Sequence, residues 1–578
     1  MLASLAWRHL RARIWEILAV VVLQTAATLA ALELPNYNAR IIDEGVAVGD
    51  TGAIWRLGAL MLGVTAIQMV CTALAIYFGA RLAMSLGAAL RSRIFTRIHR
   101  FSAQDFHSFG ASSLITRSTN DIQQIQTTTM LAFSVMIGAP IMGIGGIIMA
   151  VRQNARMSPL LLVLVPALAV VILIVMRRLT PLFTSQQERL DAMNTALREE
   201  LTGIRVIRAF VRQPFVRARY RLANDRLREV ALSIGAWFSF MFPAIGLIIS
   251  GATIGVLWLG ARLIDAGDMQ VGSLMAFINY VGMISQAVMM ASMIFIVVPR
   301  ANVAARRVAA VIDHEPSVAD PDEPRRLDGP WSFALDEAVV RYPGAEEPVL
   351  DRVSLDLAPG TTTAIIGPTA AGKTTLVNLL PRMMDPTSGA VTANGVPLTD
   401  LPLDELRSRI ALVPQHSYLF SGTIATTVSG TRHPDDAQRE RVRRALDGAQ
   451  ALDFVDALDD GIDHPVEPGG ANFSGGQRQR LAIARALYRR ADLYVFDDSF
   501  SALDYATDAR LRRSLPDYTG GAAVLVVAQR VASIRHADAI CVLEDGRIVG
   551  RGTHAELMTS CPTYREIVAS QMTEEEAA

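Results

Sequence analysis

Apolar residues are concentrated in the first half of the chain. Six apolar segments occur before residue 300, and each is about 20 residues long, the length that an α-helix needs to cross a bilayer. Glycine, alanine and β-branched residues are mixed through them, as is usual where membrane helices pack together. The pattern predicts a six-helix transmembrane domain over residues 1–312, with spans near Ile14–Leu34, Ala53–Ala80, Met130–Val151, Pro159–Met176, Trp237–Gly260 and Val271–Val298.

The N-terminus is basic and is followed directly by the first apolar segment, Ile14–Leu34. This arrangement is also typical of a cleaved signal peptide, whose apolar core is usually about 7–15 residues long. The segment here is longer and further spans follow it. We therefore expect a retained first transmembrane helix.

Arginine is distributed unevenly among the connections between spans. Basic residues gather at the N-terminus and in the two long connections, after the second and the fourth span, and cytoplasmic segments carry such an excess. We expect a protein of the cytoplasmic membrane. Both termini and both long loops are predicted to lie in the cytoplasm. The arginines concerned are Arg8, Arg11, Arg13, Arg81, Arg91, Arg93, Arg97, Arg100, Arg177, Arg178, Arg205, Arg208, Arg212 and Arg217.

The two long loops each contain about fifty polar residues of helical character. Because such lengths exceed any turn, the spans are predicted to continue as helices into the cytoplasm and to fold back. A short segment with a glycine lies in each loop, within His107–Ile122 and Leu201–Gln213. These segments either cap a solvated helical hairpin or connect to a cytoplasmic domain.

The sixth span is rich in flexible thioether side chains. Methionine suits a pocket that accepts varied apolar ligands, but it is also ordinary core filler, and both interpretations stay open. The residues are Met275, Met283, Met289, Met290 and Met293, with Asn279, Tyr280 and Gln286 among them.

A proline-rich, charged stretch, Asp313–Pro330, predicts a linker, and the composition changes after it. Over residues 331–578, strand-like apolar runs alternate with helical ones, a pattern that predicts an α/β domain with a largely parallel sheet. Lys+Arg and Asp+Glu both number 55, so net charge does not point to nucleic acid. The three cysteines, Cys71, Cys541 and Cys561, are too far apart for a CxxC-type zinc site or a disulfide framework.

The sequence GPTAAGKTT, Gly367–Thr375, matches the phosphate-loop pattern G-x-x-x-x-G-K-[ST]. It follows an apolar strand and opens a helix, which is the context that the motif requires. In such a loop, backbone N–H groups surround the phosphates, Lys373 reaches the β and γ phosphates, and the Thr374 hydroxyl binds Mg²⁺. The alternative, a purely structural turn, explains neither the lysine nor its context.

A second apolar strand, LYVFDD, ends in two carboxylates. Asp497 is placed to hold Mg²⁺, usually through water, and Asp498 to orient the attacking water. The sequence therefore predicts binding of ATP and Mg²⁺ by a P-loop nucleotide-binding domain.

The stretch FSGGQ, Phe473–Gln477, resembles the signature motif of ABC transporter ATPases. The order also matches: phosphate loop, VPQHSYLF with Gln415, FSGGQ, acidic strand and SALD ending in Asp504. Six spans followed by one such domain resemble a half-transporter of the type IV, multidrug-exporter-like fold. The implied fold is an α-helical six-span transmembrane domain followed by an α/β P-loop nucleotide-binding domain with a helical subdomain.

The resemblance implies roles for individual residues. Tyr342 would stack on adenine, Gln415 would touch Mg²⁺ and sense the membrane domain, and Asp504 would lie at a dimer interface. Segments around Phe109–Asp121 and Gly203–Phe210 look like the coupling helices of these exporters. The nucleotide-binding set is Tyr342, Gly367, Thr369, Ala370, Ala371, Gly372, Lys373, Thr374, Thr375, Ser474, Gly475, Gly476, Gln477 and Asp504, with Thr374, Gln415 and Asp497 as metal ligands.

The chain departs from the family pattern around the catalytic position. Asp498 stands where glutamate is usual, Gln529 stands at the switch position where histidine is usual, and Ala370-Ala371 replaces Gly-Ser. Aspartate is one methylene shorter, and a misplacement of roughly 1 Å can cost on the order of a hundredfold in rate. If position 370 needs a positive φ, alanine would strain it. Together these departures predict a site that binds ATP and hydrolyses it slowly.

The signature motif, in contrast, keeps its serine, both glycines and its glutamine. The expected protein is thus the degenerate-site subunit of a heterodimeric ABC exporter, an ATP hydrolase coupled to transport of drugs, lipids or metabolites. Its partner would be a second half-transporter whose phosphate loop this signature completes. Three alternatives stay open: a siderophore-type importer on the same fold, a regulatory ATP-binding subunit, and a slow homodimer.

Overall fold

The structure, a computed structural model, describes residues 2–571 and divides into two compact units. The first contains Met1–His99 and Ala111–His314, and the second contains Arg100–Gly110 and Glu315–Ala578. The second unit therefore includes a short piece of the first long loop, which is far from the rest of that unit in sequence.

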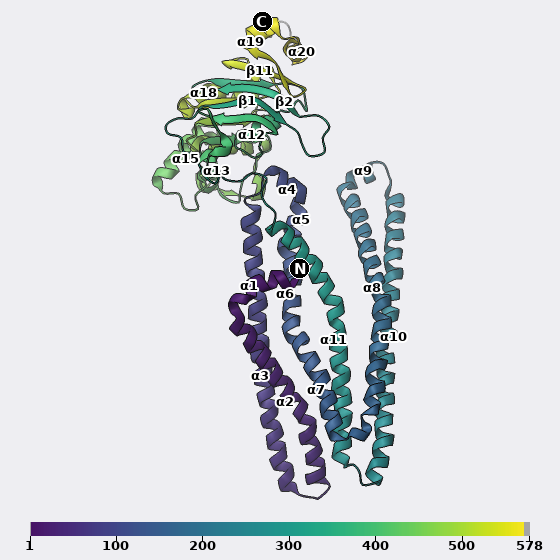
Figure 1. Cartoon of the computed structure of the whole chain (residues 1–578). Coiled ribbons are helices and arrows are strands. Elements are labelled where there is room, and N and C mark those ends of the chain that lie inside the picture. Colours follow the sequence, from purple (N-terminus) through teal and green to yellow (C-terminus); the bar gives the residue numbers. More distant parts are fainter. Residues whose placement is uncertain (1, 572–578) are drawn as a thin grey trace. The chain divides into compact units, whose positions relative to one another are not determined.

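The first unit consists of helices alone (Figure 1). Its 3-10 and π segments are η1 (Arg11–Arg13), η2 (Ile41–Val46), η3 (Arg117–Asp121), η4 (Ala132–Met136) and η5 (Ala155–Met157). Its α-helices are α1 (Leu2–Leu10), α2 (Ile14–Arg40), α3 (Thr51–Ile98), α5 (Ala111–Thr116), α6 (Ile122–Leu131), α7 (Ile137–Gln153), α8 (Pro159–Thr202), α9 (Ile204–Ala209), α10 (Gln213–Asp265) and α11 (Val271–Ile312).

Six helical stretches in the described residues are long and apolar enough to cross a membrane, which confirms the six predicted spans. They extend well beyond the apolar segments. The 48 residues of α3, for example, correspond to roughly 72 Å of helix, more than twice the thickness of a hydrocarbon core. The spans therefore continue as helices outside the bilayer, as the long polar loops predicted.

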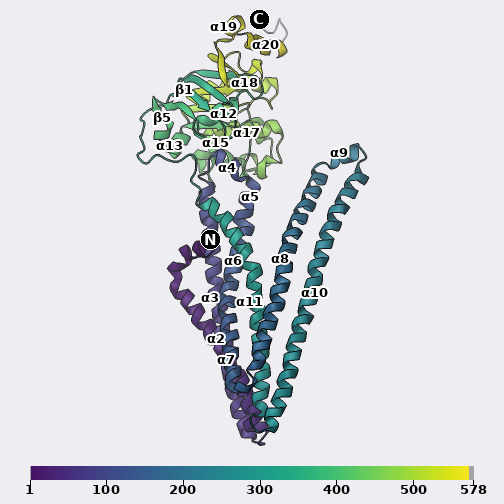
Figure 2. The same ribbon diagram turned by 45° about the vertical axis from the view of Figure 1, so that its right-hand side comes forward.

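Helices α8 and α10 form a long hairpin with α9 at its tip (Figures 1 and 2). At its other end this hairpin packs with α11 in one apolar cluster that includes Leu164, Val256 and Phe277. Both views show the hairpin diverging from α3, α6 and α11 toward α9. The tip is thus held only through its own two helices within this unit.

The second unit is an α/β domain. Its central sheet has the order β12-β11-β3-β10-β9-β6, in which all neighbours are parallel except β11 and β12, and a second sheet has the order β2-β1-β4-β5. Its strands are β1 (Phe333–Val340), β2 (Leu350–Leu357), β3 (Thr362–Ile366), β4 (Ser388–Ala393), β5 (Val396–Pro397), β6 (Ile410–Val413), β7 (Gly422–Thr423), β8 (Pro465–Val466), β9 (Leu493–Asp497), β10 (Ala523–Val527), β11 (Ala539–Glu544) and β12 (Arg547–Gly552).

Strands β9 and β10 are buried along their full length, so both faces of the central sheet are covered, as parallel sheets require. The helices are α4 (Ala103–Phe109), α12 (Lys373–Leu379), α13 (Leu403–Ser408), α14 (Ile424–Ser429), α15 (Asp436–Gly448), α16 (Leu452–Asp456), α17 (Gly475–Tyr488), α18 (Tyr505–Thr519), α19 (His554–Ser560) and α20 (Pro562–Gln571), with 3-10 turns η6 (Leu398–Asp400), η7 (Gly461–Asp463), η8 (Pro468–Gly470) and η9 (Val531–Ser533). The predicted six-span and α/β fold class is confirmed.

Candidate functional site

The phosphate loop connects β3 to α12, and close backbone approach shapes it. A Cβ on Gly367 would lie 1.9 Å from the Leu543 carbonyl oxygen, so no larger residue fits there. Gly372 has φ +100°, and Ala370 has φ +69°, in the left-handed region that favours glycine. The strain that the sequence predicted conditionally for Ala370 is therefore present.

Lys373 is turned onto its own loop. Its Nζ donates hydrogen bonds to the carbonyl oxygens of Gly367 (2.8 Å) and Pro368 (2.7 Å). Burial lowers the pKa of Lys373, and the charges of Asp498 and Asp497 act in the opposite direction. An ammonium group over a loop of backbone N–H groups fits the phosphates of a nucleotide.

Tyr342 lies beside the first helical turn after the loop. Its hydroxyl is 3.2 Å from the Thr375 hydroxyl, which is buried, whereas 39% of the tyrosine is exposed. The ring is thus tied to the phosphate-binding segment while keeping an accessible surface, as stacking on a base requires.

Asp497 is the last residue of strand β9, and Asp498 follows it directly. Asp497 is buried, and desolvation together with the neighbouring Asp498 charge raises its pKa, while Lys373 lowers it. Desolvation also raises the pKa of Asp498, against a hydrogen bond from Gln415 that lowers it. Two adjacent carboxylates repel each other, so a bound cation or a proton is needed to balance their negative charge fully.

The catalytic position holds the three polar residues that the sequence singled out. The Oδ2 atom of Asp498 accepts hydrogen bonds from Nε2 of Gln529 (3.0 Å) and from Nε2 of Gln415 (3.3 Å). Asp498 itself has φ +47°, and its N–H donates to the Val527 carbonyl oxygen at 2.9 Å. The fold therefore brings Gln415, Asp498 and Gln529 together from three separate segments.

The donor set suits magnesium. Thr374, Gln415 and Asp497 offer a hydroxyl, an amide oxygen and a carboxylate, all hard oxygen ligands, and Mg²⁺ usually takes only one or two carboxylates and completes its shell with water and phosphate. No group of three or more His, Cys, Asp or Glu residues that could hold a metal occurs in residues 2–571. The residues fit a nucleotide-bound Mg²⁺ rather than a metal cage.

The signature motif forms the N-terminus of α17. Ser474 caps this helix in a reciprocal arrangement: its Oγ accepts the Gln477 N–H (3.3 Å), and Oε1 of Gln477 accepts the Ser474 N–H (2.9 Å). A Cβ on Gly476 would lie 3.2 Å from the Ala502 carbonyl oxygen, a close contact that a larger residue could make only if its neighbour shifted. Phe473 is buried and contacts the Phe454 ring edge-on, so its aromatic side chain belongs to the core.

Asp504 begins the next helix, α18. Its Oδ1 accepts the Thr507 N–H at 2.9 Å, and that hydrogen bond is the main reason why the pKa of Asp504 is lowered. Asp504 is therefore an ionised cap that fixes the start of α18, which follows the acidic strand.

The first loop segment, α4, is integrated into the α/β unit. Ser102 and Asp105 form a capping box at its start and are both buried. Oδ2 of Asp105 also accepts the Ser317 N–H (3.0 Å), and the Ser102 and Ser317 hydroxyls lie 2.6 Å apart. The short helix thus lies before the segment expected from the sequence, Phe109–Asp121, most of which forms the start of the following long helix.

The second loop segment, α9, coincides with the expected Gly203–Phe210. Its apolar side chains are on the surface: 62% of Val206 and 72% of Phe210 are exposed. The next residue, Val211, has φ +51°, which is strained for a β-branched side chain. An apolar, strained tip is typical of a segment that binds another surface.

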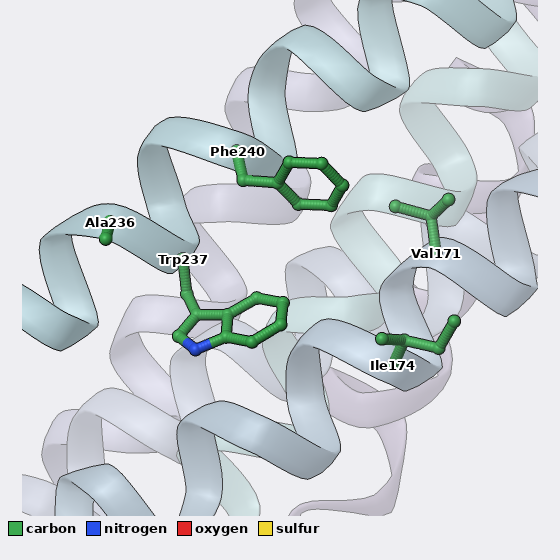
Figure 3. A pocket seen from close by; sticks show the side chains of 5 residues that line it. All are labelled: Val171, Ile174, Ala236, Trp237 and Phe240. Carbon is green, nitrogen blue, oxygen red and sulfur yellow. The ribbon is translucent and has the colours of Figure 1, made fainter.

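An apolar pocket of about 420 Å³ lies between α8 and α10 (Figure 3). Trp237 and Phe240 of α10 face Val171 and Ile174 of α8 across it, and Ala236 completes the lining. The methionine-rich span contributes no residue to it. Tyr280 of that span is buried and donates a hydrogen bond to the Leu32 carbonyl oxygen at 2.9 Å, a packing role.

Two features of the site have no signal in the sequence. The Ser102–Asp105–Ser317 cluster depends on residues more than 200 positions apart. Gln571, at the end of α20, contacts the backbone on both sides of Arg530, next to the switch position. These four residues do not belong to any of the motifs, so only the tertiary structure reveals their contacts.

Comparison with known proteins agrees with this architecture. The family "ABC transporter transmembrane region" matches residues 17–288, and the family "ABC transporter" matches residues 350–501. An uncharacterized ABC transporter ATP-binding protein of Mycobacterium tuberculosis (strain H37Rv) is 46% identical over 574 residues, covering 99% of this chain and 98% of the relative.

An ATP-dependent lipid A-core flippase of Chromohalobacter salexigens is 30% identical over 561 residues, covering 97% of this chain and 96% of the relative. Among solved structures, a bacterial Atm1-family ABC exporter with ATP bound superposes with a TM-score of 0.81 at 24% identity, over 98% of this chain and 99% of that one, which concerns the fold alone.

The chain therefore belongs to the ABC transporter family. It is a multi-pass membrane protein with the exporter fold that joins the permease and the ATP-binding domain in one chain. Domains of this family bind ATP, normally with Mg²⁺, and couple its hydrolysis to transport.

Proposed function

We propose that this chain is the degenerate-site subunit of a heterodimeric ABC exporter, with the membrane domain at 1–312, a linker at 313–330 and the nucleotide-binding domain at 331–578. Its own phosphate loop binds ATP with little turnover, and its signature motif completes the site of a second half-transporter. The observation that carries the proposal is the polar cluster at the catalytic position, where Asp498 is bonded to Gln529 and Gln415.

Three features of this nucleotide site, two in the cluster and one in the phosphate loop, disfavour hydrolysis. The aspartate carboxylate is one methylene closer to the backbone than a glutamate would be, so it reaches less far toward a water at the γ-phosphate. Gln529 can donate a hydrogen bond but carries no positive charge. Ala370 holds a strained conformation in the loop that surrounds the phosphates.

Mg²⁺ would be held by Thr374, Gln415 and Asp497, and when bound it screens the negative charge of the phosphates. In this site Lys373 orients the phosphates, and Tyr342 provides a ring for the base. These contacts bind nucleotide whether or not the bond is cleaved. ATP in such a site helps to hold two domains together.

The signature face supports the second half of the proposal. Ser474, Gly475, Gly476 and Gln477 keep a complete capping arrangement at the N-terminus of α17. The N-terminus of a helix attracts a phosphate, because its free N–H groups and dipole favour negative charge. We infer that it meets ATP held by the partner's phosphate loop, with Asp504 at the same interface.

The cargo is proposed to be hydrophobic or amphipathic: a lipid, a drug or a metabolite. The apolar pocket of Figure 3 would suit such molecules. One relative bears the name ATP-dependent lipid A-core flippase. We place the chain in the cytoplasmic membrane with both termini inside, where α4 and α9 transmit movements of the ATP domains to the spans.

The test is to reconstitute the chain in lipid alone and together with a similar half-transporter that has the catalytic glutamate and the switch histidine, and to measure ATPase activity. We expect near-background activity alone and robust, cargo-stimulated activity together. Robust activity alone would instead establish a homodimeric pump. Cargo movement in vesicles of known orientation distinguishes export from import, and turnover that no cargo stimulates in any pairing would indicate a regulatory subunit.

A further inference from the structure

The switch loop, here residues Gln529–Ser533, is held at both ends by side chains from outside it. At its far end, Nη1 of Arg512 on α18 donates to the carbonyl oxygens of Ala532 (3.1 Å) and Ser533 (3.3 Å). Arg512 is itself fixed by a two-pronged ion pair with Asp508. This end of the loop is thus tied to α18.

At its near end, the loop is held by Gln571, the last residue of α20. Nε2 of Gln571 donates to the Gln529 carbonyl oxygen at 2.7 Å, and Oε1 accepts the Val531 N–H at 2.9 Å. One partner can only accept and the other can only donate, so the orientation of the amide is unambiguous. Both side-chain hydrogen-bonding groups of Gln571 contact the backbone of the switch loop.

Helix α20 is a firm support for this contact. Tyr564 and Val568 are buried in the core of the α/β unit, and the Tyr564 hydroxyl lies 2.7 Å from Nδ1 of His554. Thr563 donates a hydrogen bond to Glu544 at 2.8 Å. The helix can therefore fix the position of a side chain at its end.

One side of the switch loop borders a cavity. A cavity of about 1540 Å³ lies between α18, α20 and strands β3 and β10, and Arg530, Ala532 and Gln571 are among the residues that line it. Arg530 points its guanidinium toward the Tyr505 ring (5.6 Å) rather than into a protein core. The Val531 side chain anchors the middle of the loop in the apolar core, so the polar contacts fix the backbone on either side of that anchor.

We propose that Gln571 is a positioning residue for the switch loop. By holding the backbone on both sides of Arg530, it determines where the Gln529 side chain lies with respect to Asp498, to which Gln529 donates a hydrogen bond at 3.0 Å. The C-terminal helix is thereby part of the nucleotide site, although it touches no nucleotide. The effect of Gln571 on hydrolysis rests on the proposed function, in which Gln529 acts at bound ATP.

Three variants separate the two hydrogen bonds, and a fourth is the control. Gln571→Ala removes both bonds, Gln571→Glu keeps only the acceptor for the Val531 N–H, and Gln571→Lys keeps only a donor for the Gln529 carbonyl. Ser570→Ala is the matched control, because within residues 2–571 the exposed Ser570 hydroxyl bonds the Ile567 carbonyl of its own helix, at 2.7 Å, and does not reach the switch loop.

The first measurement is hydrogen–deuterium exchange of the full-length chain in lipid without nucleotide. Gln571→Ala is expected to raise exchange of the Val531 amide about tenfold, as loss of one hydrogen bond allows, and Gln571→Glu is expected to retain most of the protection. The control should match the parent chain. Exchange of Gln571→Ala equal to that of Ser570→Ala would overturn the proposal.

The second measurement is the kinetics of ATP hydrolysis by the chain carrying Asp498→Glu and Gln529→His, because the parent chain alone is expected to hydrolyse ATP near background. Gln571→Ala is expected to lower kcat about three- to tenfold and to leave KM for ATP within about twofold, because a misplaced group affects the reacting geometry more than nucleotide binding. Unchanged kcat, or a fall that merely follows a lower melting temperature, would show a structural contact only.

Failure of the proposed function gives a different result. If Asp498→Glu with Gln529→His does not raise turnover, the side chains at positions 498 and 529 are not what limits this site. The role of Gln571 is then still decided by the exchange of the Val531 amide in Gln571→Ala compared with Ser570→Ala.

Discussion

The phosphate-loop face and the signature face of the α/β unit differ in backbone strain and in the completeness of their local hydrogen bonding. On the first, two residues other than glycine, Ala370 and Asp498, have positive φ angles, and the catalytic carboxylate lies against two amide groups. On the second, the helix cap of Ser474 is reciprocal, and Gly476 stands where a Cβ would lie close to a carbonyl. One domain therefore contains a strained nucleotide-binding face and a relaxed, complete signature face.

This difference implies that the two faces can serve different ATP molecules. A composite site needs a phosphate loop from one domain and a signature from another, so impairment of one face leaves the other useful. If this comparison is correct, substitutions on the signature face should affect transport far more than those on the phosphate loop.

Ser474→Arg places a bulky cation where the signature meets the partner's nucleotide. We expect the ATPase activity of the heterodimer to fall on the order of a hundredfold, because a small displacement at the reacting centre has such an effect. Ser474→Ala is the milder comparison: it removes the hydroxyl and about 1 kcal/mol of helix capping without adding bulk or charge, so a much smaller fall is expected. Equal activity of both variants would contradict the proposed role of this face.

Asp498→Glu combined with Gln529→His restores reach and charge at the catalytic position. Turnover by the chain without its partner is expected to rise about tenfold, since a general base contributes at least that much when correctly placed. Steady-state phosphate release in lipid measures the effect. No increase would mean that Ala370, Ala371 or the signature limits the rate.

Lys373→Ala removes the ammonium group that orients the phosphates in this chain's own loop. In the heterodimer we expect weaker ATP binding but a kcat within about threefold of the parent, because the loss concerns binding rather than the rate-determining chemistry. Titration with a fluorescent ATP analogue and turnover assays separate the two. Complete loss of turnover would place essential chemistry in this site.

Ala370→Gly relieves the positive φ of the phosphate loop. We expect a stabilisation of about 1 kcal/mol, which raises the melting temperature of a domain of this size by roughly 2–4 °C. Ala371→Gly is the matched comparison: Ala371 is buried without a positive φ, so its change should destabilise the fold. Shifts of the same sign for both would argue against strain at Ala370.

The sequence was sufficient for the membrane spans and the phosphate loop because their signals are local. An apolar run of about 20 residues has few alternatives to a membrane helix. The motif Gly367–Thr375 lies directly between the strand and the helix that it requires, so its context can be recognised from adjacent residues. The first loop shows the limit. Phe109–Asp121 has the glycine and the amphipathic pattern expected of a coupling segment, yet the short helix is Ala103–Phe109, whose start is fixed by hydrogen bonds to Ser317.

By itself, the sequence determined the six spans, the α/β domain and the identities of Lys373, Asp498 and Gln529, since these depend on composition, periodicity and motif order. The tertiary structure alone decided that Gln415 and Gln529 both bond Asp498, that Ala370 is strained and that Gln571 holds the switch loop. The physical reason is that a hydrogen bond between distant segments or a φ angle follows from the packing of the whole domain, and no short stretch of residues encodes it.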